Sequence, residues 1–153
     1  MRKPVATSFI AVALLVLLPT ANAQEPEPVG PKLPPKVRGL LIQEMVAVLG
    51  ASHEILDALI QGQDDVVAEK AQAIHDSFIL QQQMSDEDRQ ALMAAVPESF
   101  VERDRAFHAL TAQLAEAARQ GDSTRQGALY GEMLGACIAC HERYATDRFP
   151  GLK

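Results

Sequence analysis

The sequence contains no tryptophan, two tyrosines and five phenylalanines, so it offers little aromatic surface for stacking nucleic-acid bases. It has no cluster of basic residues either, and its formal net charge is −6. An acidic chain of this kind is a poor ligand for nucleic acid or for an anionic membrane surface. We therefore expect neither nucleic acid nor a membrane as a partner.

Cysteine is equally scarce, because Cys137 and Cys140 are the only two in the chain. No cysteine follows the apolar run near the N-terminus, which excludes a lipid anchor on a new N-terminal cysteine. A structural zinc site normally needs four clustered ligands. The other histidines lie far from this pair in the sequence, so a zinc site is not expected.

The first residues have the layout of a secretory signal peptide. A basic start, Met1-Arg2-Lys3, is followed by the apolar run 9–18 and by the small residues Ala21 and Ala23 before a cleavage point. The apolar run is shorter than the roughly 20 residues that span a bilayer. We expect residues 1–23 to be removed and the mature chain to begin at Gln24.

Two further segments follow. Residues 24–35 hold five prolines without apolar periodicity, which predicts an extended, flexible leader. Residues 36–153 show helical spacing of apolar residues and no strand signal, which predicts a single all-α domain. Long helices are expected over 36–61, 64–83, 97–120 and 123–145, with a short helix between Ser85 and Pro97. This pattern is typical of an antiparallel four-helix bundle.

The first of these helices carries a wide apolar stripe, which predicts burial against more than one neighbour. We expect its inner face to consist of Leu41, Met45, Val48, Ile55 and Leu59.

The most informative motif is Cys137-Ile-Ala-Cys140-His141, near the end of the last helix. Positions i, i+3 and i+4 share one face of a helix, so both thiols and the imidazole point the same way, with Tyr144 completing the face. A thioredoxin-type thiol pair would lie at the start of a helix after a strand, which this pair does not. Cys-x-x-Cys-His is the attachment signature of haem c. The motif therefore predicts one covalent haem, with thioethers to Cys137 and Cys140 and with His141 as the iron ligand.

An exported four-helix bundle with this motif close to its C-terminus resembles the class II c-type cytochromes, the cytochrome c′ and cytochrome c-556 family. The resemblance covers residues 36–144 and implies a periplasmic haem protein with His141 as proximal ligand. It also implies antiparallel homodimers formed through the first helices. Family members tend to carry Arg or Lys four residues after the haem histidine, where this chain has Ala145.

The other side of the iron is less determined by the sequence. In the family, a first-helix arginine precedes the distal residue by about one turn. Aligning Arg38 with that arginine places Ile42 over the iron, and isoleucine cannot be a ligand. Met45 is the nearest methionine and the possible sixth ligand, although methionine is also a common residue of cores. Arg38 is a possible partner of a haem propionate. His53, His75 and His108 are further distal candidates in principle.

From these observations we expect one-electron transfer through a covalent haem c, with a redox partner protein of unknown identity. The alternative is a five-coordinate haem that binds NO or CO. No distal pair of histidine and arginine is found at helical spacing, so we do not expect an enzyme.

Overall fold

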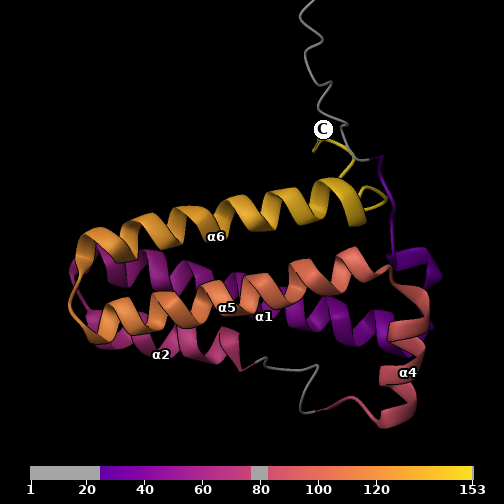
Figure 1. Ribbon diagram of the computed structural model, residues 1–153, viewed down its shortest axis with the longest axis horizontal. Helices are drawn as coiled ribbons and strands as arrows, with labels where there is room; N and C mark the ends of the chain where they lie inside the picture. Colours follow the sequence, from indigo (N-terminus) through magenta and orange to yellow (C-terminus); the bar gives the residue numbers. More distant parts are fainter. Residues whose placement is uncertain (1–24, 77–82, 153) are drawn as a thin grey trace, which may run out of the picture.

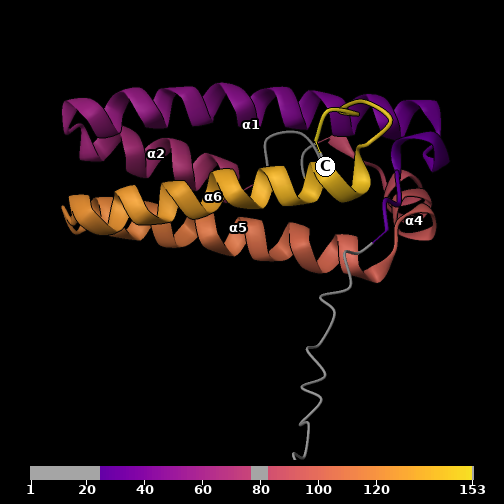
Figure 2. The same cartoon turned by 90° about the horizontal axis from the view of Figure 1, so that it is seen from above.

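The computed structural model describes residues 25–76 and 83–152, and these form an antiparallel four-helix bundle (Figure 1). The long helices run in alternating directions, and their bounds are α1 Pro35–Gln61, α2 Asp64–His75, α5 Glu98–Arg119 and α6 Ser123–Tyr144. The short helix α4, Asp86–Ala95, lies at the end of the bundle where α1 begins and α6 ends (Figure 2). The all-α bundle expected from the sequence is confirmed.

Local signals in the sequence explain where these helices begin and end. Gly62 adopts a left-handed conformation with φ 68° and ends α1, as glycine commonly does. Ser85 and Asp88 form a reciprocal capping box at the start of α4. Asp122 accepts a hydrogen bond from the Arg125 N–H and caps α6. The second helix was expected to reach Gln83, but α2 ends at His75, and residues 77–82 lie outside the described part of the chain.

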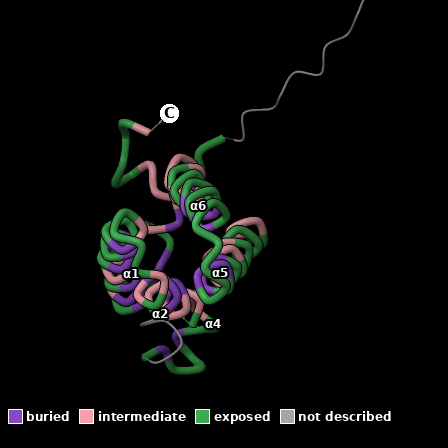
Figure 3. Tube along the Cα trace, turned by 90° about the vertical axis from the view of Figure 1, so that its left-hand side faces the viewer, coloured by how far each residue is buried: buried purple, intermediate pink, exposed green. Residues whose placement is uncertain are grey.

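The core lies between α2 and its two neighbours α1 and α5, and it continues between α5 and α6. Figure 3, which looks along the bundle, shows buried stretches on the inner sides of these helices. Alanines of α2 and α5, including Ala71 and Ala115, allow the two helices to approach closely. The largest buried aliphatic side chains fill the centre of the bundle: Ile55, Ile74, Leu114 and Met133.

The inner face of α1 differs from the one expected. Val48 and Ile55 are buried as predicted, but Leu41 and Leu59 are only half-buried and Met45 is 39% exposed. The buried side passes instead through Leu40 and through Glu44, which is 1% exposed. The apolar stripe of α1 is wider than the side of α1 that α2 covers. The centre of the stripe therefore does not coincide with the buried face of the helix.

The proline-rich leader contacts the end of α6. Its backbone N–H groups at Glu27 and Val29 donate to the carbonyls of Arg143 and Tyr144, over 2.7 and 3.0 Å. Val29 and Leu33 are buried, with the short 3-10 helix Gly30–Lys32 between them. The leader satisfies carbonyl groups that the end of α6 leaves without helical partners.

By length and composition, α1 is the one helix in the described ranges that meets the requirements for crossing a membrane. Core helices of soluble proteins meet the same requirements, and α1 packs along α2 through one of its sides.

Candidate functional site

The C-terminal half of α6 presents both thiols and the imidazole on one side. Cys137, Cys140 and His141 are half-buried, and neither cysteine is in a disulfide. Tyr144, one turn further, is buried at 1% exposure; it donates a hydrogen bond to Ser99 Oγ at 2.8 Å and packs edge-on against Phe100. The predicted sharing of one helical face is thus present in the structure.

The surroundings of these groups determine their protonation. Burial raises the pKa of Cys140 to about 11, and burial also raises the pKa of Cys137. Both are therefore protonated thiols near neutral pH rather than the thiolates of a redox-active pair. Burial lowers the pKa of His141, which favours the neutral imidazole that can bind a metal.

Tyr130 of α6 and Ser52 of α1 are hydrogen-bonded, and this contact indicates the register between the two helices. Tyr130 Oη donates to the Ser52 carbonyl at 3.1 Å and lies 3.2 Å from Ser52 Oγ. The two helices are antiparallel (Figures 1 and 2), so residues before Ser52 lie level with residues after Tyr130. Equal rise along both helices brings residues 41–45 of α1 level with residues 137–141 of α6.

This register places Met45 on the side of α1 that faces the motif. Met45 precedes Ser52 by seven residues, or two turns, and so lies on the same side of the helix. Ile42 precedes Ser52 by ten residues and lies nearer the outer edge, although it is half-buried. Helical spacing therefore puts Met45 closer than Ile42 to the side of α1 marked by Ser52.

Apolar side chains on both helices are exposed around this region. Leu134 and Ile138 share the side of α6 that carries His141, and they are 43% and 49% exposed. Met45 of α1 is exposed as well, on the side marked by Ser52. Two free thiols, a neutral imidazole and uncovered apolar surface on facing helices fit a flat apolar group attached to α6 and covered by α1.

Arg38 has a carboxylate partner within the protein. Its Nη2 lies 3.6 Å from Asp147 Oδ2, in the segment that follows α6. The same segment brings Phe149 onto His141, with ring centroids 4.7 Å apart. Sequence reasoning missed Asp147 and Phe149, because both follow the helix end and only a turn of the chain returns them to the site.

The other histidines have different environments. His75 Nδ1 donates to the His108 carbonyl, and His108 Nδ1 donates to the Ile74 carbonyl, each over 2.9 Å. The hydrogen bond to Asp104 raises the pKa of His108. Both rings therefore link α2 to α5, whereas His53 is exposed on α1.

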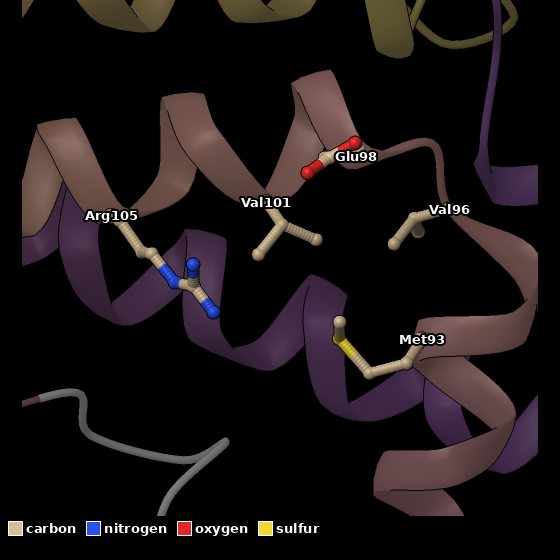
Figure 4. Close-up of a pocket in the computed structure, with 5 residues that line it drawn as sticks. All are labelled: Met93, Val96, Glu98, Val101 and Arg105. Atoms are coloured by element: carbon tan, nitrogen blue, oxygen red, sulfur yellow. The ribbon is translucent and has the colours of Figure 1, made fainter.

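A separate cavity of about 310 Å³ lies between α4 and α5. Figure 4 shows Met93 and Val101 extending into the same space, with Arg105 and Glu98 at its edges. None of the motif residues lines this cavity. In the described ranges, no group of three or more His, Cys, Asp or Glu side chains that could hold a metal ion is found.

The chain matches the model of a known protein family. The family model described as Cytochrome C′ matches residues 42–145, which include the whole motif and Met45 but not Arg38. No curated protein and no solved structure matches the chain.

Proposed function

The chain belongs to the cytochrome c′ family, and on this premise we propose that it transfers single electrons through its haem. Members of this family are non-enzymatic proteins that bind haem c covalently, and Cys137 and Cys140 fit the Cys-x-x-Cys-His attachment motif. The placement of both thiols and His141 on one face of α6 carries the proposal.

Each residue of the face has a distinct role in this proposal. Cys137 and Cys140 form the two thioethers, and His141 binds the iron through a ring nitrogen. The bound haem supplies an iron centre that alternates between the ferric and ferrous states. Tyr144, held by Ser99 and Phe100, closes the end of the site next to the motif.

On the opposite side, Met45 is the proposed sixth ligand. Its position on the α6-facing side of α1, level with the motif, supports this role. A thioether ligand raises the reduction potential of haem iron, which suits an electron carrier. Ile42 then contributes to the edge of the distal pocket. Arg38 has enough N–H donors to contact a haem propionate while it keeps Asp147.

The proposed partners are a redox protein and a second copy of this chain. Exposed residues of α1 recur at alternating intervals of three and four, the spacing of a helix–helix seam. The seam consists of Val46, Leu49, His53, Leu56 and Ile60. Four of these five are apolar, and Val46 and Ile60 are 66% and 79% exposed. Two antiparallel α1 helices would cover each other's seam.

The proposed location is the periplasm, which is typical of the family. Residues 1–23 serve as the cleaved signal peptide in this proposal, and they lie outside the described residues. Residues 24–35 form the leader, and residues 36–153 form the cytochrome domain.

Covalent attachment is tested by expressing the chain in a periplasm that matures c-type cytochromes. Intact mass should increase by one haem, and acidified acetone should not extract it. Cys137→Ala and Cys140→Ala should each leave one thioether and lower the holoprotein yield, whereas Thr146→Ala, close to the motif but outside it, should change neither. Extractable haem, or two free thiols in intact holoprotein, would contradict the proposal.

A further inference from the structure

The chain turns back after α6 and stacks an aromatic ring on His141. The N–H groups of Arg148 and Phe149 both donate to the Ala145 carbonyl at 2.9 Å. This turn brings the Phe149 ring to a centroid distance of 4.7 Å from the imidazole, with only 17° between the ring planes. The two rings therefore lie nearly parallel.

The segment that carries Phe149 is also held against the rest of the bundle. Asp147 pairs with Arg38 of α1, with 3.6 Å between Oδ2 and Nη2. Gly30 lies close to the same carboxylate, because a β-carbon there would be 3.2 Å from Asp147 Oδ2. The Leu152 N–H donates to the Phe149 carbonyl at 3.1 Å, which extends the turn beyond the ring. Contacts on both sides of Phe149 thus restrict where its ring can lie.

The environment of His141 lacks the usual orienting group. A histidine that binds a metal normally donates its second ring N–H to a carboxylate or carbonyl, which fixes the plane of the ring. Among residues 25–76 and 83–152, no hydrogen bond to either ring nitrogen of His141 is found. The parallel Phe149 ring is the contact that can fix the imidazole plane in its place.

We infer that Phe149 is a positioning residue for the axial histidine, which sets the plane of the His141 ring and excludes water from it. The inference rests on the proposed function, since it requires His141 to bind the iron. Ligand orientation and solvent exclusion both influence the reduction potential of haem iron. Because water stabilises the more highly charged ferric state, removal of the ring should lower the potential.

The test uses the full-length holoprotein and compares Phe149→Ala, Phe149→Tyr and Leu152→Ala. Phe149→Ala should change the electron paramagnetic resonance g values of the ferric haem and lower its midpoint potential. Phe149→Tyr keeps a ring of the same size and should restore both values towards those of the wild type. Leu152→Ala, in the same segment but without a ring, should leave both unchanged.

Three results would overturn the inference. Wild-type g values and potential in Phe149→Ala would show that the stack has no effect on the iron. Equal changes in Phe149→Ala and Leu152→Ala would indicate general loosening of the segment. Failure of Phe149→Tyr to restore either value would exclude ring stacking as the cause. Unchanged g values in His141→Ala would instead contradict the proposed function, because His141 would then not be the ligand.

Discussion

Met45 and Ile42 differ by three positions on α1, and in the proposed function this difference decides whether the iron has five or six ligands. The thioether of Met45 can bind iron, whereas the side chain of Ile42 cannot. The hydrogen bonds between Tyr130 and Ser52 set the register that directs Met45 towards α6. If Met45 is the sixth ligand, as proposed, the coordination of the iron depends on a contact of Ser52, two turns from Met45.

Met45→Leu is predicted to convert the haem from low spin to high spin, because leucine keeps the volume but removes the sulfur. The optical spectra of the ferric and ferrous holoprotein report this change directly. Ile42→Leu serves as the matched control and should leave the spin state unchanged. A high-spin wild type whose spectrum is unaffected by Met45→Leu would support the five-coordinate alternative that binds NO or CO.

The residues that could be predicted from sequence are those whose spacing along one helix determines their relation. Cys137, Cys140 and His141 are of this kind, because three- and four-residue intervals fix their common face. The contacts of Arg38 with Asp147 and of Phe149 with His141 depend on a turn after the helix and on the distance between two helices. No local pattern encodes either quantity.

At the scale of secondary-structure elements, Asp88 of α4 forms an ion pair with Lys36 of α1. Asp88 accepts from Lys36 Nζ at 2.5 Å and from the Ser85 N–H and hydroxyl at 3.1 and 2.8 Å. The hydrogen bond with Lys36, followed by those with Ser85, lowers the pKa of Asp88 from 3.8 to about 2. The ionised form of Asp88 is therefore favoured in the folded protein.

Asp88→Asn is predicted to reduce the free energy of unfolding at pH 6. A carboxyl with a lowered folded pKa stabilises the protein above its ordinary pKa, and this contribution is lost as the pH falls through the folded value. The difference in the free energy of unfolding between wild type and variant should narrow below pH 4 and disappear only below pH 2. Urea unfolding of the wild-type and variant holoproteins at several pH values measures this difference in the free energy of unfolding.

Two further variants complete this experiment. Asp86 lies in the first turn of α4 but outside the capping box, so Asp86→Asn should change the free energy of unfolding much less than Asp88→Asn does. Ser85→Ala removes the cap and should reduce the free energy of unfolding by about 1 kcal/mol at pH 6. A pH-independent loss in Asp88→Asn would contradict the assigned role of its charge.

Three of the helix ends were predictable because capping residues and glycine act locally, as Ser85, Asp122 and Gly62 show. The rotation of α1 about its own axis could not be predicted from the sequence. Apolar residues surround much of this helix, so periodicity alone could not separate the side that packs on α2 from the exposed seam. The burial of Glu44 was missed for the same reason.

At the scale of the whole molecule, the seam on α1 predicts a homodimer. Leu56→Glu and Ile60→Glu place charges within the seam and should each shift the protein from dimer towards monomer, because burying an unpaired carboxylate is costly. Light scattering after size-exclusion chromatography measures the mass. Met93→Glu changes an exposed apolar residue outside the seam and should leave the mass unchanged. A monomeric wild type at all concentrations would contradict the prediction.

The hydrogen bonds between the leader and α6 join residues 27–29 to residues 143–144, which are separated by most of the sequence. Closing so long a loop in an unfolded chain is entropically costly. Once the four helices have assembled, the same two segments are already neighbours and little cost remains. The leader should therefore bind to α6 late during folding. The thiols of α6, which are half-buried in the folded protein, are most exposed before that step.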